Sequence, residues 1–194
     1  MIKLKGYKIF ISSPRDVTDD KKCVEECINK FNKLHAIYDD IVFIPFTSND
    51  YAGGQGRAQG IINEKIEKCD YLIVMFHKII GYPSGECESG TVEEYELGKK
   101  LKAEGKIKEI LLLFKEITPS EEGDPGAELK KVIEFRGRIE KNRECWYKLF
   151  EDEHVLKFEI EKFLKNSLSI VKGDEVPSQK SFVVSDVVGI LPEI

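Results

Sequence analysis

The segment from Tyr71 to Phe76 is an uninterrupted run of six apolar residues that follows the polar stretch 67–70. A strand without polar alternation is buried on both faces, and such strands belong to parallel sheets that lie between two layers of helices. We therefore expect 71–76 to be the central strand of an α/β sheet.

Short apolar runs alternate with stretches of helical periodicity along most of the chain. The predicted strands are 7–12, 41–44 (ended by Pro45), 71–76, 109–114 and 145–150. The predicted helices are 18–35, a short one around 61–66, 91–101, 127–143 and 153–171, with a polar loop over 118–126. This alternation predicts a doubly wound, flavodoxin-like parallel sheet of five strands in the order 2-1-3-4-5, with right-handed crossovers and helices on both faces.

The chain is expected to consist of one α/β domain over 1–171, followed by a linker and an apolar C-terminal tail over 172–194. The composition after Lys172 is that of a linker, whereas 182–194 is apolar again. A five-stranded sheet with its own helices does not need this segment for its core. Exposed apolar stretches usually mark contacts with another chain. We therefore expect self-association or contact with a partner signalling domain.

Composition and charge exclude several classes of protein. Hydrophobic residues make up 41% and charged residues 34% of the 194 residues, as in a soluble globular protein. The net charge of −5 argues against an extended nucleic-acid surface. No apolar run is long enough to span a bilayer, and a strand so close to the N-terminus leaves no room for a signal peptide. Five scattered cysteines without a Cys-x-x-Cys pair predict reduced thiols in the cytoplasm and no metal site.

Glu94 is the candidate catalytic residue. In the predicted topology the ligand crevice lies at the carboxyl ends of the first and third strands. Glu94 follows the third strand, in the first turn of a helix expected to begin at Thr91. It lies on the inward face of that helix, whereas Glu93 falls on the polar side. A carboxylate there is expected to stay ionised, and it can stabilise a developing positive charge, orient a hydroxyl group or act as a nucleophile. Alternatively, Glu94 only completes a capping box with Thr91.

The loops around this crevice supply candidate substrate-binding residues. Arg15 precedes a helix N-terminus and is suited to a phosphate, although a structural turn would explain it equally well. His77 directly follows the third strand, where a catalytic base would be useful, and Tyr82 is suited to stacking on a base unless it is only an anchor. The full set of predicted substrate-binding residues is Ser12, Ser13, Arg15, Asp16, Tyr51, Arg57, His77 and Tyr82.

Several motifs, in this order, resemble a TIR-like family that often forms the N-terminal domain of multidomain bacterial signalling and defence proteins, including ones with NTPase modules. They are Lys8-Ile9-Phe10-Ile11-Ser12-Ser13-Pro14-Arg15-Asp16-Val17, Ile62-Asn63-Glu64-Lys65-Ile66 with Cys69-Asp70, Gly81-Tyr82-Pro83-Ser84-Gly85, and Glu88-Ser89-Gly90-Thr91-Val92-Glu93-Glu94-Tyr95-Glu96. The resemblance covers roughly the first 115 residues.

The resemblance implies an enzymatic role. Enzymatic TIR domains and the related nucleoside 2-deoxyribosyltransferases share a flavodoxin-like sheet and cleave N-glycosidic bonds, of NAD and of deoxynucleosides respectively. Gly90-Thr91-Val92-Glu93-Glu94 is similar to the Gly-Thr-x-x-Glu of the transferases, which puts their Glu on Glu94. The expected function is an N-glycosidase effector with NAD or a related nucleotide as substrate and no bound cofactor. The chain lacks the Trp-Cys-x-x-Glu of enzymatic TIR domains, so a non-catalytic assembly module and a deoxyribosyltransferase-like enzyme stay open as alternatives.

Overall fold

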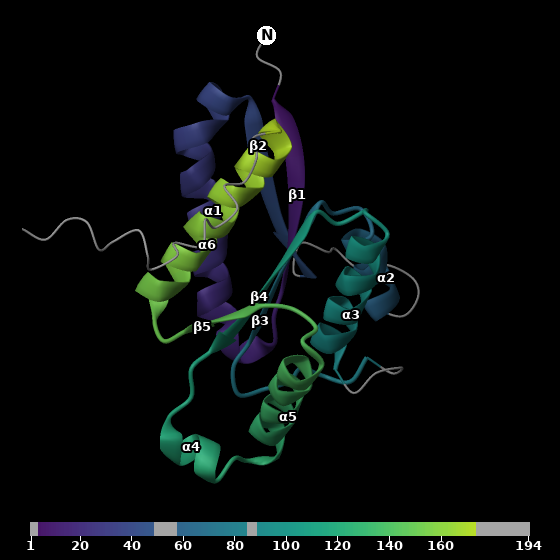
Figure 1. Cartoon of the computed structure of the whole chain (residues 1–194), viewed down its shortest axis with the longest axis vertical. Coiled ribbons are helices and arrows are strands. Elements are labelled where there is room, and N and C mark those ends of the chain that lie inside the picture. Colours follow the sequence, from purple (N-terminus) through teal and green to yellow (C-terminus); the bar gives the residue numbers. More distant parts are fainter. Residues whose placement is uncertain (1–3, 49–57, 85–88, 174–194) are drawn as a thin grey trace, which may run out of the picture.

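A computed structural model describes residues 4–48, 58–84 and 89–173, in which strands and helices alternate (Figure 1). The strands are β1 (Lys5–Ser12), β2 (Ile41–Thr47), β3 (Tyr71–Phe76), β4 (Glu109–Lys115) and β5 (Tyr147–Phe150). The helices are the 3-10 helix η1 (Arg15–Val17), α1 (Thr18–Asp39), α2 (Ala58–Ile66), α3 (Gly90–Ala103), α4 (Pro119–Gly123), α5 (Ala127–Asn142) and α6 (Glu153–Lys172).

The five strands form one parallel sheet in the order β2-β1-β3-β4-β5, as predicted. The strand β3 has the predicted bounds, and all six of its residues are buried. It lies between two neighbours, with Tyr71 opposite both Ile9 of β1 and Glu109 of β4. The fold is therefore a flavodoxin-like α/β fold, with β3 at the centre.

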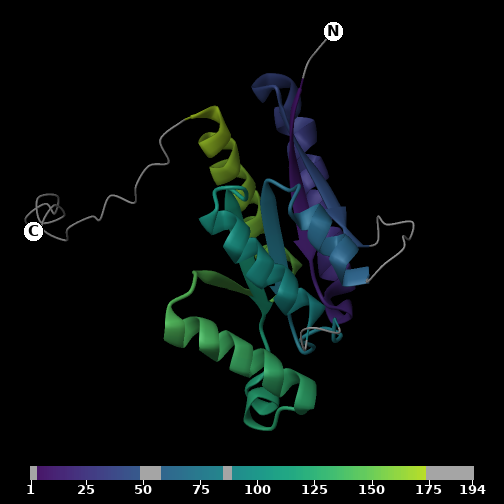
Figure 2. The same ribbon diagram turned by 90° about the vertical axis from the view of Figure 1, so that its right-hand side faces the viewer.

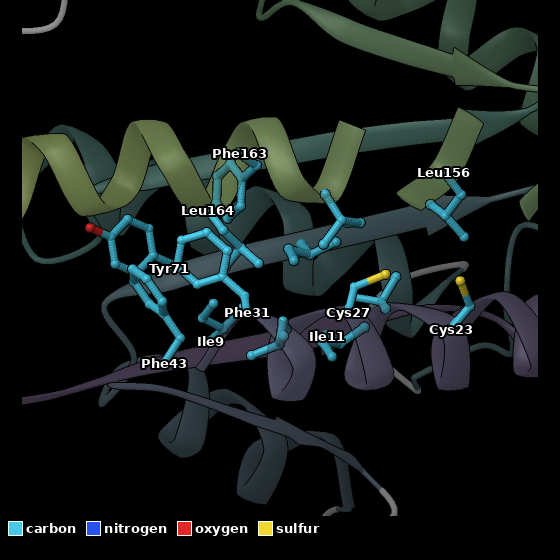
Figure 3. Packing of buried hydrophobic residues seen from close by; sticks show 14 of the residues in the cluster. Ile9, Ile11, Cys23, Cys27, Phe31, Phe43, Tyr71, Leu156, Phe163 and Leu164 are labelled. Carbon is cyan, nitrogen blue, oxygen red and sulfur yellow. The ribbon is translucent and has the colours of Figure 1, made fainter. Parts of the chain in front are cut away.

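Helices cover both faces of the sheet (Figures 1 and 2). The helices α1 and α6 pack side by side on one face, where Ile9, Phe31, Tyr71, Phe163 and Leu164 belong to one buried cluster (Figure 3). The second buried cluster joins the other face of the sheet to α2, α3 and α5. The turn after β1 therefore leads to α1 on one face of the sheet, and the turn after β3 leads toward α3 on the other face.

Two cysteines of α1 are part of the first cluster. Cys23 and Cys27 are buried one helical turn apart (Figure 3). Burial raises the pKa of Cys23 to about 12 and also raises the pKa of Cys27. These thiols are packing residues. The four cysteines in the described part of the chain, which also include Cys69 and Cys145, form no disulfide.

Several predicted boundaries are wrong; for example, α1 was predicted to end at 35 and continues to Asp39. The strand β2 continues through Pro45, because it is an edge strand with one neighbour, and proline is tolerated where the backbone N–H would point outward. Part of the predicted polar loop is the short helix α4, which begins with a capping box between Thr118 and Glu121. The last strand begins at Tyr147, two residues later than predicted.

Of the predicted linker and tail, the structure describes only Lys172 and Gly173, where α6 ends beside α1 through an ion pair from Lys172 Nζ to Asp39 Oδ1 at 3.1 Å. The remainder, 174–194, lies outside the described residues. Within the described ranges, no helix has both the length and the apolar character needed to cross a bilayer.

Candidate functional site

The carboxyl ends of β1 and β3 lie next to each other, with Ser12 opposite Val74. The chain order of the strands reverses here, because β1 is flanked by β2 on one side and by β3 on the other. The two strands lead to helices on opposite faces, so their loops part at this edge of the sheet, which is where doubly wound folds usually bind ligands. The predicted site residues of both loops therefore meet at one end of the sheet.

Glu94 of α3 points into this region and is only 7% exposed. Its two carboxyl oxygens have different partners: Ser12 Oγ donates to Oε2, and Gln59 Nε2 donates to Oε1 at 3.0 Å. Ser12 ends β1, whereas Gln59 lies in the first turn of α2. Three elements far apart in the sequence thus converge on one carboxyl group.

The capping-box interpretation of Glu94 is wrong. The helix α3 begins at Gly90, and its N-cap is Ser89, whose Oγ accepts from Val92 N at 3.1 Å. Ser89 Oγ also donates to the carbonyl of Ile80 at 2.5 Å, which ties the helix start to the loop after β3. The Glu94 carboxyl group is therefore not used to cap its own helix, and it is bound by side chains of other elements.

Burial raises the pKa of Glu94, and it outweighs the hydrogen bonds from Gln59 and Ser12, which act in the opposite direction. The charge of neighbouring Glu93 raises the pKa further, whereas the charge of Lys21 lowers it. This net rise in pKa is opposite to the direction expected from the helix N-terminus alone. Glu94 retains its proton to higher pH than an exposed glutamate.

The hydrogen bonds continue beyond Glu94. Gln59 Nε2 also contacts Asn63 Oδ1 at 3.3 Å, and Asn63 Nδ2 donates to Glu93 Oε1 at 2.7 Å. Ser84 Oγ donates to Glu93 Oε2 at 2.5 Å. Glu93 is thus half-buried and bound, not on an open polar face as predicted. We call Ser12, Gln59, Asn63, Ser84, Glu93 and Glu94 the carboxylate network.

Gln59 and Asn63 were not predicted as site residues. They are one helical turn apart in α2, so their side chains share a face of the helix. The helix also carries the buried Ile66. In the sequence, two amide side chains at this spacing on such a helix indicate a polar contact. The pattern does not identify the partner, because Glu94 lies 35 residues further along the chain.

Asp16, another predicted site residue, has a structural role. Its Oδ2 accepts from the backbone N–H groups of Lys78 at 2.8 Å and Ile79 at 3.1 Å, so it holds the loop after β3 against the loop after β1. His77 Nδ1 lies 3.7 Å from the same oxygen. Burial lowers the pKa of His77 despite the opposing charge of Asp16, which leaves the imidazole neutral at pH 7.

Two buried polar atoms of the loop after β1, Ser13 Oγ and Asp16 Oδ1, have no hydrogen-bond partner among the described residues. Buried polar groups are nearly always hydrogen-bonded. These two atoms are therefore potential contacts for a water or a ligand group at this edge of the sheet.

Arg15 and Tyr82 form a third contact, between the loops that follow β1 and β3. Arg15 Nη1 donates to the Tyr82 hydroxyl group, and the guanidinium carbon lies 5.1 Å from the centre of the tyrosine ring. Tyr82 is 65% exposed. The pair connects the two loops and presents a cation and an aromatic ring to solvent. The other two predicted residues, Tyr51 and Arg57, lie outside the described residues.

Fold and site together define a flavodoxin-like α/β domain with a buried, hydrogen-bonded carboxyl group where the strand order reverses. Over residues 8–165 the chain matches the family described as "Domain of unknown function (DUF4062)", and it belongs to that family. No curated protein matches the chain.

Among solved structures, the crystal structure of general stress protein 14 from Treponema denticola in complex with FMN is similar to the chain. The two sequences are 15% identical, and the match covers 86% of this chain and 98% of the other, with a TM-score of 0.32. A likeness this weak supports no inference about the ligand of this chain.

Proposed function

We propose that the domain is a TIR-like effector that cleaves the N-glycosidic bond of NAD or a related nucleotide, with Glu94 as the essential carboxylate. The observation that supports this most is the position of Glu94. It is buried at the carboxyl ends of β1 and β3, and its oxygens are held by Ser12 and Gln59 instead of by its own helix N-terminus. Side chains from three elements that fix one carboxyl group are typical of a preorganised site.

The chemistry requires a carboxylate beside the ribose. When the bond from C1′ to the nitrogen of the base breaks, the electron pair leaves with the base, and positive charge develops on the sugar ring. An ionised Glu94 would stabilise that charge. Water would then add its hydroxyl group to C1′ and release a proton, for which the neutral imidazole of His77 is a candidate acceptor.

The raised pKa of Glu94 favours a cationic substrate. Burial favours the protonated form of Glu94, whereas the hydrogen bonds from Ser12 and Gln59 favour the carboxylate. A positively charged group bound close to Glu94 would lower its pKa further. The nicotinamide ring of NAD carries such a charge before cleavage and loses it when the base departs. This charge is the reason to prefer NAD over a neutral deoxynucleoside.

The Arg15–Tyr82 pair is suited to the rest of a nucleotide. Guanidinium groups bind phosphate oxygens in pairs of hydrogen bonds, and an exposed tyrosine ring can stack on a base. The two side chains contact each other in the structure, so a bound nucleotide would replace their mutual hydrogen bond. Arg15 follows β1 and Tyr82 follows β3, the two strands at whose carboxyl ends the site is proposed.

The alternative is a non-catalytic assembly module. Both oxygens of Glu94 already have protein donors, an arrangement that also fits a buried structural carboxyl group. In either function we place the protein in the bacterial cytoplasm, in defence or signalling. The unpaired cysteines of the described residues are in keeping with a reducing compartment.

The test is an incubation of the purified chain with NAD, NADP, ATP and deoxynucleosides, followed by chromatography of the released base. The proposal predicts release from NAD or a related nucleotide and none with Glu94→Gln. Transfer of a deoxyribose between bases would instead identify a deoxyribosyltransferase-like enzyme. Absence of release from every substrate, by a folded protein that self-associates, would identify the assembly module.

A further inference from the structure

A groove of about 920 Å³ runs along the beginning of β4. Its floor is the strand segment 109–111, and its walls come from α3, α6 and the segment 144–148 that leads into β5. Glu109 lies opposite Tyr71, the first residue of β3, so the groove is at the amino end of the sheet. Glu94 is at the other end, and the groove is therefore separate from the candidate site.

The floor of this groove, which we call the β4 groove, is a free strand edge. The strand β5 pairs with β4 only from Leu112, opposite Tyr147, to Lys115. Within the described part of the chain, the three residues of β4 before Leu112 pair with a strand only on the β3 side. Ile110 N donates to Glu109 Oε1 at 3.0 Å, and Lys102 binds the same oxygen. The Glu109 side chain thus accepts a hydrogen bond from the backbone N–H of Ile110, which an additional strand could accept instead.

Apolar side chains gather at the β4 groove. Trp146, the one tryptophan of the chain, is 94% exposed in its wall. Ile170 of α6 is also exposed there, whereas Ile110 and Leu111 of the floor are only partly buried. An apolar surface along an unpaired strand edge is suited to an added strand, because main-chain hydrogen bonds supply affinity and the apolar walls take alternate side chains.

We propose that residues 182–191 of the same chain occupy the β4 groove as an added strand. This segment reads Phe-Val-Val-Ser-Asp-Val-Val-Gly-Ile-Leu, and its β-branched residues favour a strand. The helix α6 delivers the chain to this place, since Ile170 lines the groove and α6 ends two residues later, at Lys172. The connecting residues 174–181 can span roughly 26 Å when extended. That length allows the segment to reach the floor without leaving its own protomer.

The docked segment would cover Trp146 and bond to the outward backbone groups of 109–111. It would also anchor whatever follows the domain to the end of the sheet opposite Glu94. This inference does not depend on the proposed enzymatic function, because it uses no residue of the carboxylate network.

Fluorescence of the full chain tests the proposal, because Trp146 is its only tryptophan. The wild type should show blue-shifted emission and weak quenching by acrylamide. Val184→Asp with Val188→Asp puts charges on one face of the segment, and it should shift the emission to the red and increase quenching severalfold. Ser181→Asp with Ser185→Asp adds the same charge at polar positions and should leave both readings near those of the wild type.

Amide hydrogen exchange provides a second reading. The backbone amide of Ile110 should exchange severalfold faster in the double valine variant than in the wild type, with equal circular dichroism. A wild-type Trp146 that is already fully quenched, with unchanged exchange in the variant, would overturn the proposal. Protection that disappears on dilution would mean that the segment of a second copy fills the groove, which would overturn the assignment to the same chain.

Discussion

A β-carbon at position 90 would lie 2.6 Å from Gln59 Oε1, so the hydrogen at Gly90 keeps open the space from which Gln59 donates to Glu94. Gly90 is the first residue of α3, and Gln59 is in the first turn of α2. The start of one helix therefore sets the position of a side chain on the other. That side chain in turn orients the buried carboxyl group.

Gly90→Ala should displace Gln59 without disturbing the fold. The obstructing atom is at the far end of a flexible side chain, and alanine favours a helix over glycine, so the free energy of unfolding should change by less than about 1 kcal/mol. Loss of the hydrogen bond from Gln59 should raise the pKa of Glu94 further, measured by carbon NMR of the carboxyl group. Gly60→Ala in α2, where a β-carbon would meet nothing, should leave that pKa unchanged.

Glu94→Gln should abolish base release and leave a folded protein, because the amide keeps an oxygen for the hydrogen bonds within the network. Glu93→Gln is the matched control. Glu93 is bound by Asn63 and Ser84, and its charge only raises the pKa of Glu94, so its replacement should be far milder. Equal loss of activity in the two variants would contradict the assignment of Glu94 as the essential carboxylate.

The raised pKa of Glu94 predicts how stability depends on pH. The folded protein binds the Glu94 proton more tightly than the unfolded chain, in which the pKa is near 4.5. The stability that comes from this proton is therefore present below pH 4.5 and is lost as pH rises toward the folded pKa. Urea unfolding should show similar stability for wild type and Glu94→Gln at pH 4, and a more stable variant at pH 7. A wild type that gains on the variant as pH rises would show that the pKa is lowered instead.

Arg15→Ala should raise the KM for a nucleotide more than it lowers kcat, because a phosphate contact of this kind acts in the ground state as well as in the transition state. Lys22→Ala removes an equally exposed cation from α1, whose partner is Asp19, and should leave both constants unchanged. Unchanged kinetics in Arg15→Ala would place the phosphate elsewhere, most plausibly at Arg57.

Gly98→Ala should destabilise the core. A β-carbon at this position would lie 2.3 Å from Leu72 Cδ2, because α3 packs directly on the central strand. Overpacking of a close contact costs about 1–3 kcal/mol, measurable as a lower urea midpoint. Gly137→Ala in α5, where a β-carbon would meet nothing, should instead stabilise the protein by about 0.5–1 kcal/mol. A Gly98→Ala protein as stable as the wild type would show that Leu72 moves aside without cost.

The sequence by itself determined the parts of this protein that depend on neighbours along the chain. The apolar run 71–76 had to be buried on both faces, and it is the central strand of a parallel sheet with the predicted order. Helical periodicity was enough to put Glu94 on the inward face of its helix. The enzymatic function inferred from the TIR-like motifs stays a prediction.

Only the tertiary structure decided what Glu94 contacts and what its environment does to it. Thr91 was expected to cap the helix, but Ser89 has this role, and its hydroxyl group also reaches the carbonyl of Ile80. Gln59 meets Glu94 because α2 packs against α3, a contact that no local pattern contains. The pKa of Glu94 rises because burial in the assembled fold outweighs the hydrogen bonds from Ser12 and Gln59. Periodicity reports which face of an element is buried, whereas the partner and the polarity at that face depend on elements distant in the sequence.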